Sequence, residues 1–435
     1  MLARRSFLAS TAASAMLGLA GRAFAKSADY DVVIIGAGVA GLAAARQLQA
    51  LGRRFVMLEA RDRIGGRAWT EDFMGVPVDR GAHWLHNAEV NPLVGVAKSR
   101  NLVLTPSNRE EGRLFDGPGQ LAADAERAIA RSDRALERLF RRRLHDLDGA
   151  SLDSLAVDEA ALAARLVAFA IGEEADRIAA FDVAMMAGDG TDLAIEGGLG
   201  QFVQGIGARV PVSLKARVER IDWSTPGGVT VSGSFGSLRA RACLITVPPA
   251  VLLAASGIRF VPELPHAKQA AVARLPMGVF TKVALRLDKP IAELPLYSID
   301  AQRFARGSLH ALHHAPGSAL VTLMIGGNAA RDLIAAGEQA AVAEAQSVLA
   351  ATAGSSATTR VRGGFLSEWL SDPLALGSYA HVTPGSGDPR GDLALTVAER
   401  LFFAGDTVGG DLVMSVGGAW RSGKAAAQDI SRVLA

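Results

Sequence analysis

The chain has little of what defines several classes of protein. Its 435 residues include one cysteine, Cys243, which rules out an internal disulfide and a metal centre built on cysteine, and we expect no metal site. The 46 lysines and arginines nearly balance the 44 acidic residues, so no overall charge attracts nucleic acid. No apolar run is long enough to span a membrane. These absences leave a globular protein whose partners must be argued from local sites.

The first 25 residues have the pattern of a removable export signal. Arg4 and Arg5 precede an apolar, small-residue run that ends at Ala23-Phe24-Ala25, which is typical of a twin-arginine signal peptide with its cleavage site. A membrane anchor is the alternative, but the run is too short to cross about 30 Å of hydrocarbon. We therefore expect the twin-arginine (Tat) translocation machinery to export the chain to the periplasm, with residues 1–25 removed and no stable membrane insertion.

A dinucleotide-binding motif follows the signal. A β-branched strand predicted at 30–35 leads into three spaced glycines, then into a helix, and a second strand ends at Glu59. Gly36 permits a tight turn, Gly38 lets backbone amides approach a pyrophosphate, and Gly41 allows the helix to pack closely on the strand. Glu59 can accept hydrogen bonds from ribose hydroxyls. The motif predicts a Rossmann-type fold that binds NAD or FAD.

The next segment favours FAD. Residues 61–67, Arg-Asp-Arg-Ile-Gly-Gly-Arg, resemble the segment with which the flavin-containing amine oxidase family holds FAD. The resemblance implies that Arg61, Gly66 and Arg67 bind the cofactor, with Arg67 near the pyrophosphate and the flavin. A solvated basic loop is the alternative, but two glycines between arginines suit an anion cradle better.

The resemblance continues over essentially the whole chain after the signal. One segment, 81–86, is similar to the segment that passes beside the isoalloxazine ring, most of all in polyamine oxidases. Val218 matches a valine whose backbone contacts adenine in the family. Residues 401–406 and 415–423 match the family's C-terminal flavin-binding strand, loop and helix. The resemblance implies these further cofactor-binding residues: Gly81, Ala82, His83, Trp84, Val218, Asp406, Ser415 and Val416.

Four residues are the expected catalytic ones, also by resemblance. Lys282 matches the family's active-site lysine, and a buried lysine has a lowered pKa that suits holding a water near flavin N5. Trp369 and Tyr379 match the segment that supplies an aromatic wall of the substrate site, although Tyr379 is alternatively a core tyrosine. His86 resembles a histidine that contacts substrate in polyamine oxidases, and a structural role is its alternative.

Departures from the family narrow the substrate. Ser415 stands where monoamine oxidases have the second tyrosine of a substrate cage, which favours a bulkier or secondary amine. Ser378 stands where they have the cysteine that links covalently to the flavin, so FAD should be noncovalent. The region of Trp84 lacks the arginine that binds a carboxylate in L-amino acid oxidases. Asp189 and Asp192 are candidates, by location only, to pair with the distal ammonium of a polyamine.

The expected architecture is an α/β (α+β) two-domain flavoprotein. A discontinuous Rossmann-type FAD-binding domain should comprise residues 27–90, 196–262 and 385–435. A substrate domain of mixed sheet and helices should comprise residues 91–195 and 263–384, with two to four helices between 121 and 180. The basic stretch from Arg134 to Arg143 is expected to be a solvated helix face, with a binding patch as the alternative.

These features predict an exported FAD-dependent amine oxidase. A primary, secondary or polyamine would lose hydride to flavin N5 and become an imine that water hydrolyses, with O2 or a periplasmic acceptor reoxidising the flavin. Two alternatives stay open. One is a flavin dehydrogenase or desaturase of the same fold that acts on a cyclic amine or a C–C bond and reduces a cytochrome or quinone. The other is a catalytically silent FAD-binding partner protein.

Overall fold

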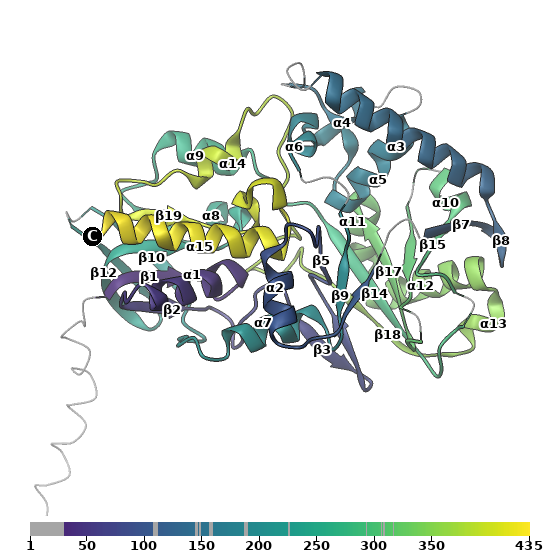
Figure 1. Cartoon of the computed structure of the whole chain (residues 1–435), viewed down its shortest axis with the longest axis horizontal. Helices are drawn as coiled ribbons and strands as arrows, with labels where there is room; N and C mark the ends of the chain where they lie inside the picture. Colours follow the sequence, from purple (N-terminus) through teal and green to yellow (C-terminus); the bar gives the residue numbers. More distant parts are fainter. Residues whose placement is uncertain are drawn as a thin grey trace, which may run out of the picture.

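The computed structural model describes residues 30–435 apart from 108–111, 144–146, 148, 156–159, 187–189, 225–226, 293, 306, 308 and 316. The expected signal peptide and Asp189 therefore lie outside the described residues. Within the described part, no helix is both long and apolar enough to cross a membrane. The molecule has a mixed α/β fold built around two large sheets (Figure 1).

The first large sheet contains the strands of the dinucleotide motif. Its strands lie in the order β13 (Arg259–Val261), β10 (Val218–Asp222), β11 (Val229–Gly233), β12 (Gly236–Ile245), β1 (Tyr30–Ile35) and β2 (Phe55–Leu58), and β19 (Leu401–Phe403) pairs with β12. Strand β1 runs parallel to β2 and β12, and β19 runs parallel to β12. The carboxyl ends of these four strands therefore meet at one edge, where open α/β sheets bind their ligands.

Helices cover both faces of this sheet. On one face, α1 (Val39–Ala50) packs against α15 (Val416–Val433), with α2 (Pro92–Ser99) and α7 (Leu199–Gly207) beside them (Figure 1). The contact between α1 and α15 is close because Gly423 has no side chain, and a Cβ there would overlap the carbonyl oxygen of Ala40. The other face packs against the region of α8 (Pro249–Leu253), α9 (His266–Ala273) and α14 (Pro389–Ala394). Residues 32–35 of β1 and residues 242–245 of β12 are consequently buried on both faces.

The second large sheet is mostly antiparallel. Its strands lie in the order β18 (Val361–Ser367), β14 (Phe280–Leu287), β17 (Leu320–Gly326), β16 (Ala311–His313), β15 (Tyr297–Asp300), β7 (Gly112–Gly117) and β8 (Gln120–Leu121). Only the β15–β7 pair, among these described strands, is parallel. Helices near this sheet are α3 (Ala123–Arg143), α5 (Ala161–Ile171), α10 (Ala301–Ala305), α11 (Gly327–Ala336), α12 (Glu338–Ala353) and α13 (Ser355–Thr358) (Figure 1). In α3, Arg134 and Arg138 are exposed while Ala135 and Leu136 are buried, which fits the expected solvated face.

Smaller elements connect the two sheets. A hairpin is formed by β3 (Thr70–Phe73) and β4 (Val76–Asp79), and β5 (Trp84–Leu85), β9 (Leu193–Ile195) and β6 (Leu104–Pro106) form a three-stranded sheet. The remaining short helices are α4 (Leu152–Leu155), η4 (Ala175–Arg177), α6 (Ala180–Ala184), η5 (Asp406–Val408) and η6 (Gly410–Leu412). The first sheet thus joins strands from three separated stretches of chain, whereas the exact domain boundaries stay a prediction.

Candidate active site

The glycine-rich turn leaves an open cradle at the start of α1. Gly36 has a φ of +99°, and a Cβ on Gly36 would lie 2.7 Å from Thr246 Oγ1. A Cβ on Gly41 would overlap the carbonyl oxygen of Gly36, so the helix packs on the strand as the motif requires. Gly38 is the N-cap of α1 and offers no capping side chain, and a Cβ there would meet nothing within 4 Å. The free amides of the first turn therefore suit the pyrophosphate of FAD.

Glu59 is buried and ties two loops together. Its Oε2 accepts a hydrogen bond from the Ala37 amide at 2.7 Å, and its Oε1 accepts one from the Arg61 amide at 2.8 Å. Each carboxylate oxygen keeps a further lone pair that a ribose hydroxyl can use. The sequence predicted the ribose role alone and gave no signal for this backbone role. Glu59 therefore shapes the cradle as well as offering an acceptor to FAD.

The arginine-rich segment joins three of the predicted site segments. Arg67 donates to the backbone carbonyl of Ser378 and, at 2.6 Å, to Asp406 Oδ1. The Ala82 amide donates to the Arg67 carbonyl at 3.1 Å, and a Cβ on Gly66 would lie 3.3 Å from the Cα of Gly38. Residues predicted from distant parts of the sequence thus meet around Arg67.

Arg61 lies at the side of this assembly. It pairs with Asp372 at 2.8 Å, and its guanidinium carbon lies 6.0 Å from the ring centroid of Trp369. Arg61 and Trp369 both line an open cavity of about 530 Å³, together with Arg63, Trp69, Arg80 and their neighbours. Arg61, a predicted cofactor-binding residue, and Trp369, a predicted substrate-site residue, therefore line the same cavity.

Lys282 lies on β14 and reaches the segment that leads into β5. Its Nζ donates to the carbonyl oxygens of Gly81 at 2.6 Å and Asp79 at 3.2 Å, and lies 5.7 Å from a ring centroid of Trp84. Burial lowers the pKa of Lys282 to about 8, although the Asp79 carboxylate opposes the shift. The structure thus places the amine between the second large sheet and residues 79–84.

The two predicted aromatic wall residues are anchored by their polar atoms. Trp369 is buried and donates from Nε1 to the Arg80 carbonyl at 3.2 Å, and a Cβ on Gly81 would lie 3.2 Å from its ring. Tyr379 donates its hydroxyl to the carbonyl of Ala170, and its ring lies 6.4 Å from that of Phe280 at a tilt of 33°. Both rings are therefore fixed in place, and their contact with substrate stays a prediction.

Strand pairing brings His86 and Asp192 together. Because β5 pairs with β9, Trp84 lies opposite Ala194, and the residues beyond these strand ends approach one another. His86 Nδ1 lies 2.9 Å from Asp192 Oδ1, so Asp192 already has a partner other than a substrate ammonium. In the sequence, location alone makes Asp192 a candidate to pair with the distal ammonium of a polyamine. The structure makes it the partner of a predicted substrate residue.

Three further predicted cofactor residues are buried. Val218 begins β10, and Val416 is the first residue of α15. Ser415 is the N-cap of α15, where its hydroxyl accepts from the Gly418 amide at 3.1 Å and donates to the Leu412 carbonyl at 2.7 Å. Ser415 thus has a definite structural role, and its position opposite Tyr379 stays a prediction.

A buried ion pair links the loop that carries Tyr379 to the loop that carries Asp406. Sequence reasoning missed this pair. Arg390 donates to both carboxylate oxygens of Asp182, at 2.7 and 2.8 Å. It also donates at 2.9 Å to the carbonyls of Ala380 and Thr407, which adjoin Tyr379 and Asp406 respectively. Asp182 and Arg390 are separated by 208 positions, and neither lies in a recognisable motif. We call this pair the Asp182–Arg390 clamp.

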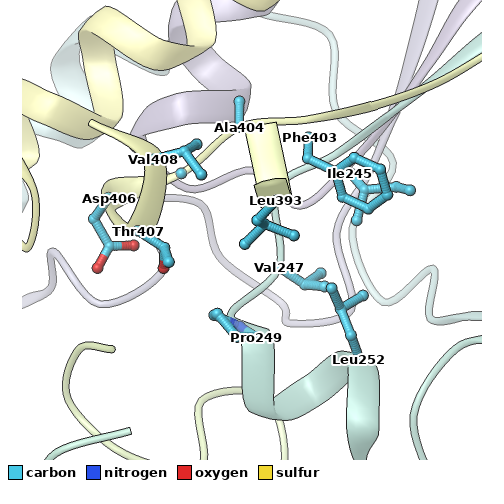
Figure 2. Close-up of a pocket in the computed structure, with 11 residues that line it drawn as sticks. Ile245, Val247, Pro249, Leu252, Leu393, Phe403, Ala404, Asp406, Thr407 and Val408 are labelled. Atoms are coloured by element: carbon cyan, nitrogen blue, oxygen red, sulfur yellow. The ribbon is translucent and has the colours of Figure 1, made fainter. Parts of the chain in front are cut away.

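Apolar packing supports the loop that carries Asp406. Figure 2 shows Asp406 and Thr407 at one end of a small pocket and Ile245, Phe403 and Leu252 at the other. The pocket has a volume of about 10 Å³, which is room for about one water molecule. It is too small for a substrate. Within the described residues, no cluster of histidine, cysteine, aspartate or glutamate is arranged to hold a metal ion.

Comparison with known proteins identifies the class. A model of the family described as flavin containing amine oxidoreductase matches residues 39–431. The chain is 31% identical to polyamine oxidase 4 of rice (Oryza sativa subsp. japonica) over 92% of this chain and 88% of that protein. It resembles the solved structure of putrescine oxidase bound to putrescine, with 22% identity, a TM-score of 0.81, and coverage of 92% of this chain and 99% of the other. Cyclohexylamine oxidase from Brevibacterium oxydans IH-35A gives 25% identity, a TM-score of 0.79, and coverage of 93% and 99%.

The chain therefore belongs to the flavin-containing amine oxidoreductase family. It is an FAD-dependent amine oxidoreductase with a mixed α/β fold. The predicted family, fold class, enzyme class and cofactor are thus confirmed. The open cradle at Gly38 is the feature of the chain itself that fits the cofactor best.

Proposed function

We propose that the protein is an exported amine oxidase that uses noncovalent FAD to convert a primary, secondary or polyamine to an imine, which water then hydrolyses. The observation that carries this proposal is the buried amine of Lys282, held by the Gly81 and Asp79 carbonyls beside Trp84. When bound, FAD supplies acceptance of a hydride from the carbon next to nitrogen. The protein's own residues supply orientation, a water-excluding site and control of protons.

Each group of site residues has a separate part in this proposal. The free amides at Gly38, with Glu59 and Arg67, would hold the pyrophosphate and ribose of FAD. Trp369 and Tyr379 would flank the substrate nitrogen with aromatic faces, which attract an amine. Lys282 would hold a water and provide positive charge where electrons pass to O2. The relatives named for polyamine, putrescine and cyclohexylamine oxidation support an amine substrate.

Two finer parts of the proposal rest on sequence. The twin-arginine pattern in residues 1–25 supports export through the Tat machinery to the periplasm. Ser378 supports noncovalent FAD because serine lacks the thiol needed for the covalent link. In the structure, the Ser378 hydroxyl donates to the Phe280 carbonyl at 2.8 Å and accepts from its amide at 2.9 Å, so it has a local structural role.

The test is anaerobic mixing of the purified protein with putrescine, cyclohexylamine, N-methylbutylamine and spermine while the flavin absorbance is followed. Bleaching by one class of amine is expected, and air should then restore the oxidised spectrum. Denaturation followed by filtration should release the FAD. Bleaching without recovery in air would favour a cytochrome or quinone acceptor. Retained FAD with no bleaching by any amine would contradict the proposal and favour a desaturase or a silent flavoprotein.

A further inference from the structure

His83 and Asp79 form a histidine–carboxylate pair beside Lys282. His83 Nδ1 lies 3.1 Å from Asp79 Oδ2, and Asp79 is almost completely buried. A neutral imidazole that donates from Nδ1 to a carboxylate keeps its other nitrogen, Nε2, as a proton acceptor. A quarter of the His83 side-chain surface is still accessible. The ring is therefore held at one nitrogen, and part of its surface stays accessible to a bound molecule.

Asp79 is itself fixed by other groups. Its carboxylate accepts from the amides of Leu199 at 3.0 Å and Gly200 at 3.2 Å, at the start of α7, and from the hydroxyl of Thr70. Hydrogen bonds and the positive end of the helix keep a carboxylate ionised, and the pKa of Asp79 is lowered by hydrogen bonds and by charge despite its burial. Asp79 can therefore orient His83 and stabilise a positive charge on its ring without taking the proton.

Each of the elements packed around His83 places a titratable side chain near its ring. Asp79 lies at the end of β4, Lys282 on β14, His313 on β16, and His86 follows β5 in the same loop. The His83 ring stands edge-on to Trp84 at 4.5 Å and to His313 at 5.2 Å between centroids. Burial and Lys282 lower the pKa of His83, while Asp79 raises it, and the net direction is downward. The imidazole is accordingly neutral at neutral pH and able to accept a proton.

An amine substrate creates a need for such a group. Alkylamines are ammonium ions at neutral pH, and their nitrogen must regain its lone pair before the adjacent carbon can lose a hydride. Lys282 does not meet this need while it carries its own proton, since its pKa is about 8. Asp79 is enclosed by the start of α7 and by His83. His83 and His86 each have one ring nitrogen at a carboxylate and accessible surface, and His83 is the one whose carboxylate partner also provides a carbonyl to Lys282.

We propose that His83 is a catalytic base of this enzyme, which takes the proton from the substrate ammonium before oxidation, with Asp79 as its positioning residue. The inference rests on the proposed function. One N–H bond of the ammonium breaks, its electron pair stays on nitrogen, and a new N–H bond forms at Nε2 of His83. The resulting imidazolium faces the Asp79 carboxylate. No electrons are exchanged in this step.

The kinetic test compares His83→Gln with the wild type over a range of pH. The rate constant of anaerobic flavin reduction is measured with whichever amine of the panel reduces the wild type fastest. At neutral pH the variant should be slower by about 100-fold, as expected for loss of a general base. Its rate should recover as pH approaches the pKa of the amine itself, because free amine then enters directly. Added imidazole should partly restore the rate of His83→Ala.

The control variant is His266→Gln, because His266 is exposed at the start of α9, on the other side of the first sheet. It should leave the rate and its pH dependence unchanged. A second readout does not depend on turnover. In ¹⁵N-histidine NMR spectra of the FAD-free wild-type protein, the signals that vanish in His83→Gln should show a proton on Nδ1 and a lowered pKa.

The outcomes separate the two proposals. If amines bleach the wild type and His83→Gln has the same rate and pH profile, the role of His83 is overturned while the proposed function stands. A proton on Nε2 in the NMR spectra would also overturn it, and if His83→Gln fails to fold, His83→Ala or His83→Asn serves to assign the signals. If no amine bleaches the wild type, the proposed function fails and the role of His83 fails with it.

Discussion

The two large sheets serve the candidate site in different ways. At the edge of the first sheet, the groups offered to FAD are mainly backbone amides and glycines, of which Gly38 and Gly41 are the clearest. The second sheet contributes side chains, namely Lys282 from β14 and His313 from β16. A backbone cradle tolerates few changes because any side chain fills it. A wall of side chains can be altered one group at a time, so substrate choice can change while the cofactor site stays the same.

The largest expected effect comes from breaking the backbone cradle with Gly41→Ala. The new Cβ would overlap the carbonyl oxygen of Gly36, so α1 must move away from β1 and the turn between them must open. We expect loss of bound FAD, measured as the flavin-to-protein absorbance ratio. Gly95→Ala is the matched control, because a Cβ there meets nothing within 4 Å on an exposed part of α2. Full flavin content in Gly41→Ala would contradict the account of the cradle.

The second largest effect is expected from breaking the Asp182–Arg390 clamp. Arg390→Met leaves Asp182 buried without its partner and releases the carbonyls of Ala380 and Thr407. Breaking a buried pair in this way costs about 3–5 kcal/mol of stability. Urea unfolding followed by fluorescence measures the loss. Arg432→Met, which removes an exposed pair with Asp429, should leave the midpoint where it is. An unchanged midpoint for Arg390→Met would show that the clamp adds nothing to stability.

On the second sheet, Lys282→Met should keep FAD but slow the chemistry. Below a pH of about 8 the amine is protonated, and its charge favours the passage of electrons to O2. As pH rises through about 8 the charge is lost, so the wild-type rate of reoxidation should fall. The variant should be slower by about 100-fold at pH 7 and lack this pH step. Stopped-flow reoxidation gives both quantities, and a wild-type profile in the variant would remove Lys282 from this role.

The smallest effect should come from Glu59→Gln. A hydrogen bond to a charged group is worth about 1.5–3 kcal/mol, and glutamine keeps one acceptor while it replaces the other by a donor. We therefore expect weaker FAD binding near the lower end of this range, measured by titration of the FAD-free protein. Glu59→Ala would be harder to interpret, because it leaves both the Ala37 and the Arg61 amide without a partner, whereas glutamine keeps an acceptor for one of them. Unchanged affinity in Glu59→Gln would contradict the ribose assignment.

The same contrast explains which features were predictable from sequence. The strand at 30–35, the turn at Gly36 and the helix after Gly38 follow from local residue patterns, because glycine and β-branched residues restrict the backbone directly. The resemblance placed Lys282 and Arg67, and the structure shows which backbone groups they contact.

The contacts that escaped prediction are long-range ones. The parallel pairing of β7 with β15 joins residues far apart in sequence, and no local pattern fixes its register. The Asp182–Arg390 clamp and the approach of His313 to His83 likewise depend on how separate elements pack. Single charged or aromatic residues carry no signal of such partners, because the energy of each contact depends on tertiary burial.

The packing of α15 on α1 also has a consequence for biosynthesis. The cradle at Gly38 is among the first parts of the described chain to leave the ribosome, whereas α15, which packs against α1, is the last helix to emerge. Gly423 of α15 lies against Ala40, so α1 lacks this neighbour until α15 has been synthesised. We therefore expect a nascent chain to retain FAD only once α15 has been synthesised and has packed on α1.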